Sequence, residues 1–179
     1  MIFVINAIDS KAMAALQKDG RASWADLGTA LGLSAPAAAE RVRKLTDGGI
    51  VRGFTAVLDA EAAGFPVLAF IAVTLEAQGA RAAFLEGVRR HDLIQECHHV
   101  AGDDDFLLKV RARSLSELDA LLSDELKGRL GIARTRTTIV LGTAKETGRL
   151  PVGPPAPSAP RRPAAKEAAA RSRAARRTR

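Results

Sequence analysis

Residues 23–45 have the sequence SWADLGTALGLSAPAAAERVRKL, and this stretch shows the clearest structural pattern in the chain. Its spacing predicts a helix over 23–31, a tight turn over 31–33 and a second helix over 34–46. Gly32 can adopt the positive φ that a turn between two helices requires, and Ser34 stands where an N-cap belongs. The pattern is that of a helix-turn-helix, a motif that presents its second helix to the major groove of DNA.

The segments on either side of this motif complete a small domain. Apolar residues at helical spacing predict a further helix from about 9 to 18, which Asp19 and Gly20 end. After the motif, the β-rich stretch IVRGFTAVL over 50–58 alternates in polarity and predicts a wing or linking strand. We therefore assign residues 1–60 to a winged helix-turn-helix domain with its linking strand.

Residues 61–147 alternate between strand and helix patterns. Strands are predicted over 67–75, 94–100, 106–113 and 133–143, and helices over about 79–90 and 116–127. The order βαββαβ is that of a ferredoxin-like domain. The predicted fold class is thus α+β, with a winged helix-turn-helix at the N-terminus and a ferredoxin-like domain after it.

The net charge of +7 belongs to the end of the chain. Residues 151–179 contain eight Lys or Arg and one Glu, so this segment carries 8 − 1 = +7 and the rest of the chain is neutral. The Pro/Ala/Arg-rich composition predicts a disordered basic tail over 148–179. Such a tail can bind DNA phosphates without sequence preference, or it can be a solvated chain end without a role.

Composition also argues against several classes of protein. The chain has no run of about 18 apolar residues, so no membrane-spanning helix is expected, and its first residues lack a signal-peptide pattern. The single cysteine, Cys97, cannot form an intrachain disulfide, which fits a reducing cytoplasm. The localisation expected for a DNA-binding protein of this kind is cytoplasmic and nucleoid-associated. We find no nucleophile with a base and an orienting group, no P-loop and no G-x-G-x-x-G, so the sequence supports neither an enzyme nor a bound cofactor.

The candidate DNA-binding residues lie mainly on the predicted helix over 34–46. Its first turn is built of small residues, which lets the helix end approach base edges, and basic residues recur on the following turns. Alternatively, Arg43 and Lys44 form a solvated helix face and Arg41 makes an internal salt bridge. Arg21 and Arg52 either contact phosphate or are ordinary surface residues. The candidate set is Ser34, Ala35, Pro36, Ala37, Glu40, Arg41, Arg43, Lys44, Arg21 and Arg52.

A metal site is a second interpretation for the region around the acidic loop 103–105. Cys97, His98 and His99 lie nearby, and all these residue types can bind metal ions. His98 and His99 are neighbours on a predicted strand, however, so their side chains point to opposite faces. We therefore favour a polar hairpin loop without a metal.

Four segments in order resemble the Lrp/AsnC family of bacterial and archaeal transcription regulators. They are IDSKAMAALQKDGR (8–21), LGLSAPAAAERVRKLTDGGIV (31–51), QECHHVAGDDDFLLKV (95–110) and RTRTTIVL (134–141). The resemblance covers about residues 5–147. It implies a DNA-binding domain followed by a small-molecule-binding and dimerisation domain, dimers that form through strand pairing and build even-numbered assemblies, and amino acids bound between subunits.

The resemblance also implies an effector pocket near the loop Gly102-Asp103-Asp104-Asp105. The family commonly has G-D-Y-D there, so Asp104 stands where an aromatic residue is frequent. Gly102 would let the backbone approach a ligand, and a carboxylate of the loop would pair with the α-ammonium of an amino acid. Thr135 and Thr137 share one face of the last strand and would supply hydroxyl groups.

The function expected from these features is a sequence-specific transcription regulator that responds to an amino acid. Its expected partners are double-stranded DNA, the amino-acid effector and further copies of the chain as a dimer, tetramer or octamer, without a membrane. One alternative is a nucleoid-associated architectural protein with little effector response. Another is a sensor of a metal or other small ligand.

Overall fold

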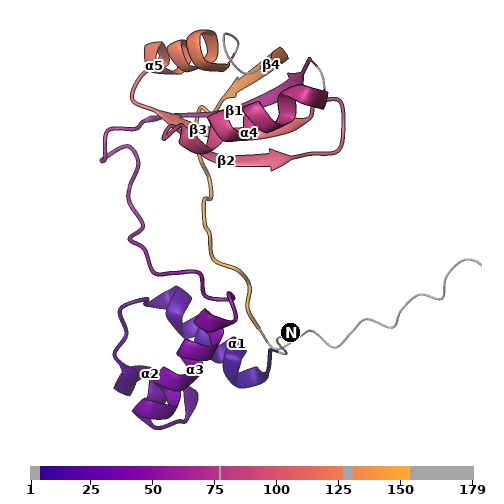
Figure 1. Cartoon of the computed structure of the whole chain (residues 1–179). Helices are drawn as coiled ribbons and strands as arrows, with labels where there is room; N and C mark the ends of the chain where they lie inside the picture. Colours follow the sequence, from indigo (N-terminus) through magenta and orange to yellow (C-terminus); the bar gives the residue numbers. More distant parts are fainter. Residues whose placement is uncertain (1–4, 77, 127–130, 154–179) are drawn as a thin grey trace, which may run out of the picture. The chain divides into compact units, whose positions relative to one another are not determined.

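The structure, a computed structural model, describes residues 5–76, 78–126 and 131–153. The chain divides into two compact units, one comprising Met1–Thr55 with Gly148–Arg179 and the other Ala56–Thr147 (Figure 1). Within the described ranges, no helix is long and apolar enough to cross a membrane. The sequence predicts a disordered basic tail over 148–179, and residues 154–179 of that tail lie outside the described ranges.

The N-terminal unit contains the three helices that the sequence predicts: α1 (Ala7–Lys18), α2 (Trp24–Leu31) and α3 (Ala35–Asp47). Asn6, Ser23 and Ser34 cap them, each accepting a hydrogen bond from a backbone N–H of the first turn. Gly32 ends α2 with a φ of 68°, as the turn requires. The buried faces of the three helices meet in one apolar cluster of Ala12, Leu27, Leu31, Ala38, Val42 and Leu45.

The wing or linking strand predicted over 50–58 is wrong for this chain. The structure has no strand in the described part of the N-terminal unit, and residues 50–58 continue from α3 as irregular chain. Their alternation does not bury one face, since Phe54, Val57 and Leu58 are all exposed. A strand needs a ladder of backbone hydrogen bonds to a neighbouring strand, and the described residues 50–58 form no such ladder.

The second unit has the predicted βαββαβ order, with small shifts at the ends of the elements. Its strands are β1 (Val67–Leu75), β2 (Ile94–His99), β3 (Phe106–Ala112) and β4 (Ile132–Ile139), all antiparallel in the order β2-β3-β1-β4. The last strand ends four residues earlier than predicted. The helices are η1 (Gln78–Ala80), α4 (Arg81–Arg90), α5 (Leu115–Ala120) and the π-helical η2 (Leu121–Leu126). The predicted helix end at 127 lies outside the described residues.

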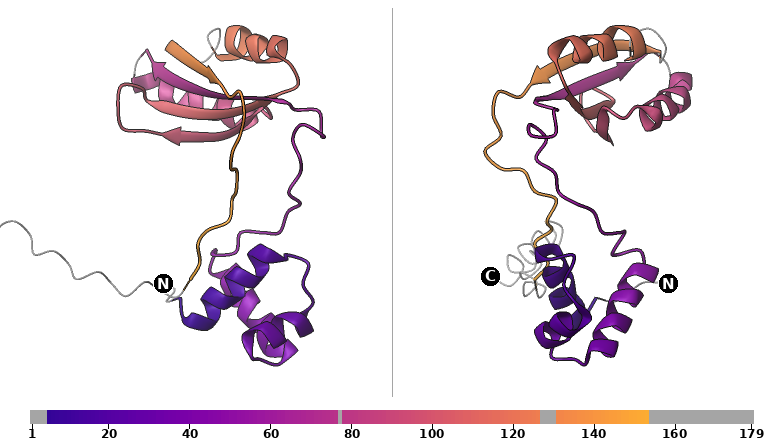
Figure 2. Two further views of the ribbon diagram at one scale, coloured as in Figure 1. Left: turned by 180° about the vertical axis from the view of Figure 1, so that it is seen from behind. Right: turned by 90° about the vertical axis from the view of Figure 1, so that its left-hand side faces the viewer.

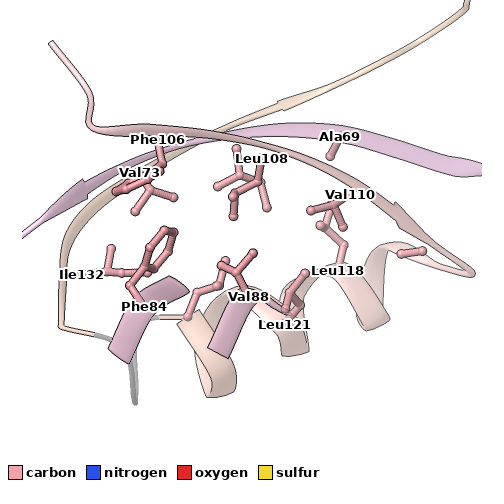
Figure 3. Close-up of a cluster of buried hydrophobic side chains, with 13 residues drawn as sticks. Ala69, Val73, Phe84, Val88, Phe106, Leu108, Val110, Leu118, Leu121 and Ile132 are labelled. Atoms are coloured by element: carbon pink, nitrogen blue, oxygen red, sulfur yellow. The ribbon is translucent and has the colours of Figure 1, made fainter. Parts of the chain in front are cut away.

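Helices α4 and α5 cover the same face of the sheet, as both views in Figure 2 show. Figure 3 shows the apolar core between sheet and helices, where Phe84 packs against Phe106 with ring centroids 4.8 Å apart. The opposite side of the sheet, which we call the open face, has no helix on it in the described part of the chain. By strand register, its side chains are Leu68, Phe70, Ala72, Thr74, Glu96, His98, Leu107, Lys109, Arg111, Arg134, Arg136 and Thr138.

Candidate DNA-binding helix and effector-binding loop

The first turn of α3 is small and its N-terminal end is accessible. Ser34 caps the helix, its Oγ accepting the Ala37 N–H at 3.4 Å, and Pro36 lies in the first turn. Gly28 allows α2 to pack closely on the turn, because a Cβ there would lie 2.7 Å from the Leu33 carbonyl oxygen. Ala35 is half-buried, whereas Pro36 and Ala37 are exposed. This end of α3 therefore presents small side chains and the positive end of the helix dipole, which suits a negatively charged partner.

Arg41 forms an internal salt bridge, one of the two alternatives that the sequence analysis gave for this residue. Its Nη1 is 3.3 Å from Asp9 Oδ1, and the two side chains are 29% and 1% exposed, respectively. The other oxygen of Asp9 accepts the Asn6 N–H at 2.9 Å as part of the cap of α1. Arg41 thus joins α3 to the start of α1, and its first role is to hold the helices together.

The remaining cations of α3 are exposed and share one acid. Arg43 and Lys44 both lie within ion-pair distance of Glu40, with Lys44 Nζ at 3.8 Å. Such exposed pairs between successive helical turns contribute little stability and exchange partners readily. This face of α3 is therefore solvated, and its two basic side chains can still turn toward a phosphate.

Arg21 and Arg52 lie outside α3. Both are exposed, and the backbone N–H of Arg21 donates to Asp19 Oδ1 at 2.8 Å. The structure also shows a feature that the sequence did not suggest, because Trp24, Pro36 and Phe54 line one shallow hollow beside α3. No local pattern predicts this arrangement, since the three residues come from separate segments.

The three carboxylates of the loop 103–105 have different surroundings. Asp105 is a structural residue, because its carboxylate accepts the Leu75 N–H at 2.8 Å and its own N–H donates to the Val73 carbonyl at 2.8 Å. Asp103 is exposed. Gly102 has a φ of 151°, a conformation that side chains rarely adopt. The loop is therefore fixed by Gly102 and Asp105, and Asp103 is displayed to solvent.

Asp104 is the centre of a polar cluster on the open face. Its Oδ2 lies 2.7 Å from Arg136 Nη2, and its Oδ1 lies 3.4 Å from Arg134 Nη2. The Thr74 hydroxyl donates to the same Oδ1 at 3.2 Å. The side chain of Asp104 is only 9% exposed, whereas Arg134 and Arg136 are 59% and 68% exposed. Asp104 already has two cationic partners, so it is a poor partner for a ligand ammonium group.

Thr135 and Thr137 lie on the other face of the sheet from this cluster. They pair in register with Val73 and Ile71, whose side chains belong to the helix-covered core, and both threonines are half-buried. The structure therefore does not bring them together with Asp104. Sequence reasoning missed Arg134 and Arg136, although the alternation in RTRT already places them on the face opposite the two threonines.

The two strand histidines point to opposite faces, as expected. His98 Nε2 lies 2.9 Å from Glu96 on the open face, and the His99 ring packs against Phe106 with centroids 5.3 Å apart. Burial raises the pKa of the Cys97 thiol, which packs against the core. Among the described residues, no three His, Cys, Asp or Glu side chains are grouped so that they could hold a metal ion.

A helix-turn-helix followed by a βαββαβ domain defines a class of DNA-binding regulators with a separate ligand-binding domain. Family models match both parts: the AsnC-type helix-turn-helix domain over residues 5–46 and the Lrp/AsnC ligand binding domain over residues 68–150. The chain belongs to the Lrp/AsnC family and is a transcription regulator of that type.

Relatives and solved structures agree with this assignment. The chain is 36% identical to the HTH-type transcriptional regulator FL11 of Pyrococcus horikoshii over 83% of its length and 97% of the relative. It is 38% identical to the leucine-responsive regulatory protein of Escherichia coli, covering 82% of this chain and 90% of that one.

Two similar structures contain L-methionine. A transcriptional regulator from Neisseria meningitidis in complex with L-Met matches with a TM-score of 0.79 and 29% identity, covering 83% of this chain and 97% of that one. The feast or famine regulatory protein from M. tuberculosis, complexed with L-methionine, matches with a TM-score of 0.74 and 33% identity, covering 82% and 99%.

Proposed function

We propose that this regulator recognises specific DNA sites with α3 and responds to an amino acid bound by its second unit. The small, accessible first turn of α3 supports the DNA part, with Ser34, Pro36 and Ala37 nearest the bases. Arg43 and Lys44 would bind phosphates, and Arg21 and Arg52 would add outer contacts. Such a protein would act in the cytoplasm at the nucleoid.

The amino-acid part of the proposal is carried by one observation: two similar structures hold L-methionine, and both match the second unit as well as the first. In this chain, the loop 102–105 is the best candidate for the effector site. Gly102 keeps the backbone accessible, and Asp103 is the exposed acid of the loop. Thr135 and Thr137 would contribute only from the helix-covered side.

Self-association through the open face is the third part of the proposal. Phe70, Ala72 and Leu107 are half-buried there without a covering helix in the described chain, between clusters of charged residues. An apolar strip with a charged rim suits a sheet-to-sheet interface between two copies. Pairing of copies would also bring two α3 helices to one DNA molecule and multiply a weak contact.

Thermal-shift measurements with each of the twenty amino acids test the sensor, and footprinting with and without the best binder tests DNA recognition. We expect at least one amino acid to raise the melting temperature, because a ligand of the folded state must stabilise it. Footprints should show discrete half-sites about one helical turn apart. Uniform protection would favour an architectural protein, and a screen without any stabilising amino acid would contradict the sensor.

A further inference from the structure

Trp24 is a large side chain at the start of α2 that the helical unit leaves half exposed. It is the first residue of the helix and is 49% exposed, and it does not belong to the apolar cluster that joins the three helices. Its ring instead lines the shallow hollow beside α3, which has a volume of about 550 Å³. A half-exposed tryptophan presents a large, rigid and amphipathic surface, which is typical of residues that contact a partner.

Trp24 lies beside the first turn of α3. Gly28 follows it by one turn on the same side of α2 and packs closely on this region, because a Cβ there would lie 3.2 Å from the Ala35 nitrogen. Trp24 and Pro36 line the same hollow, and each belongs to the first turn of its helix. The hollow therefore reaches the end of α3 that we propose for base contacts.

The lining of the hollow combines apolar surface with a cation. Trp24, Pro36 and Ala39 supply apolar surface, and Arg43 follows Pro36 by about two turns of α3. A DNA strand offers the matching surfaces, since apolar parts of its sugars alternate with phosphates along the backbone. The indole N–H can donate to a phosphate oxygen as well. The hollow thus suits a short stretch of DNA backbone.

The two acids of the hollow do not oppose this occupant. Glu40 lies within ion-pair distance of Arg43 and Lys44, so two cations balance its charge. Asp47 is the last residue of α3 and lies at the opposite end of the helix from Pro36. A phosphate near Pro36 therefore meets the first turn of α3, which contains no acid and has the positive end of the helix dipole.

We infer that Trp24 is a DNA contact residue, and that its ring packs on the sugar–phosphate backbone beside the bases that α3 reads. The inference rests on the proposed DNA recognition by α3 and adds to it a positioning residue from α2. Such a contact fixes the register of α3 on the duplex and has no sequence preference of its own. The hollow is continuous with the proposed DNA-binding face, because Pro36 and Arg43 belong to both.

The fluorescence of Trp24 reports directly on this contact, because the chain has one Trp and no Tyr. The full-length protein is titrated with a duplex cut from the most strongly protected region of the footprint, and quenching by acrylamide is measured before and after. The Stern–Volmer constant should fall about twofold or more, because DNA covers a ring that is 49% exposed in the free protein. A fall with rising protein concentration in the absence of DNA would overturn the inference, since a second copy would then cover Trp24.

Two variants measure what the ring contributes to DNA binding. Trp24→Ala should weaken binding about tenfold, whereas Trp24→Phe, which keeps an aromatic ring, should retain most of the affinity. Because neither change removes a positive charge, the slope of log K against log salt should stay at the wild-type value. Fluorescence anisotropy of the labelled duplex measures both. Leu115→Ala is the matched control, because Leu115 is an exposed apolar side chain at the start of α5 in the other unit.

The possible results distinguish this contact from DNA recognition itself. If the duplex binds but Trp24 stays equally accessible to acrylamide, and Trp24→Ala binds as tightly as wild type, the contact is overturned and the proposed DNA recognition stands. If the wild-type protein binds no duplex, both are overturned. If Trp24→Ala also melts at a lower temperature, the quenching measurement on the wild-type protein decides, since it needs no substitution.

Discussion

Each unit of the molecule contains a nearly buried aspartate that pairs with an arginine. The two pairs differ in how much of the arginine side chain is exposed to solvent. Asp9 holds Arg41 within the helical unit, where the arginine side chain is 29% exposed. Asp104 holds Arg136 on the sheet, where the arginine side chain is 68% exposed. Burying the acid requires a partner in both places. Arg41 is therefore used to build the fold, whereas Arg136 pairs with Asp104 and still has an exposed side chain on the open face.

The basic side chains of α3 are also paired with acids, so this helix alone offers little free positive charge to DNA. Arg41 is neutralised by Asp9, and Arg43 and Lys44 share Glu40. Residues 1–150 have no net charge, and the same balance is visible in α3, the helix that we propose binds DNA. Under this proposal, affinity would come from a few contacts, from repetition of α3 in an assembly and from the basic segment 151–179.

The largest effect is expected for Arg41→Ala compared with Arg43→Ala. Removing Arg41 leaves the Asp9 carboxylate buried without its cation, which should lower the free energy of unfolding by about 3 kcal/mol. Arg43 is an exposed partner of Glu40, so its removal should change stability by less than about 0.5 kcal/mol. Urea unfolding of both variants measures the difference.

DNA binding gives the second readout of this pair of variants. Arg41→Ala should weaken binding to all DNA sequences alike, because the helical unit itself becomes less stable. Arg43→Ala should weaken DNA binding, whereas the stability of the protein should stay at the wild-type value. Oligomer size should be unchanged in both, since neither residue lies in the sheet unit. An Arg41→Ala protein as stable as wild type but deficient in binding would assign Arg41 to DNA instead of to the fold.

Deletion of residues 151–179 should have the next largest effect. Removing eight basic residues should lower DNA affinity about tenfold or more at low salt. The slope of log K against log salt should become shallower by about 0.9 for each phosphate that the protein no longer neutralises, while the preferred sites stay the same. Fluorescence anisotropy at several salt concentrations measures both. A change of site preference would show that the segment does more than bind phosphate.

The sequence predicts best those features that depend on residues close together along the chain. Gly32 and Ser34 act through the turn that contains them, so the helix-turn-helix could be predicted closely. The strand expected over 50–58 failed because strand formation depends on a partner that local alternation does not reveal. The sequence analysis named Thr135 and Thr137 and missed Arg134 and Arg136, because alternation separates two faces of a strand without telling which face is turned to the core. That depends on pairing with β1, some 60 residues away.

The open face also contains the reverse of the buried-aspartate arrangement, an exposed acid that holds two nearly buried cations. Glu146, which follows β4, contacts Lys109 and lies 2.7 Å from Arg111. Both cations are on β3, so the segment after β4 crosses β1 to reach them. The hydrogen bond with Lys109 lowers the pKa of Glu146 and raises that of Lys109. Glu96, hydrogen-bonded to His98 and Lys109, also has a lowered pKa.

The smallest predicted effect is the pH dependence that Glu146 contributes. Because its pKa is lower in the folded state than the ordinary value of 4.5, its contribution is fully present above that value and is lost as pH falls through the folded pKa. Glu146→Gln should therefore be slightly less stable than wild type at pH 7, by about 0.5 kcal/mol because the acid is exposed. The difference should shrink as pH falls through the folded pKa of Glu146. Urea unfolding at pH 7 and at a series of acidic pH values measures it, with Glu86→Gln, an exposed acid on α4, as the control. A difference that does not change over the acidic series would mean that the segment is held by packing and not by the charge of Glu146.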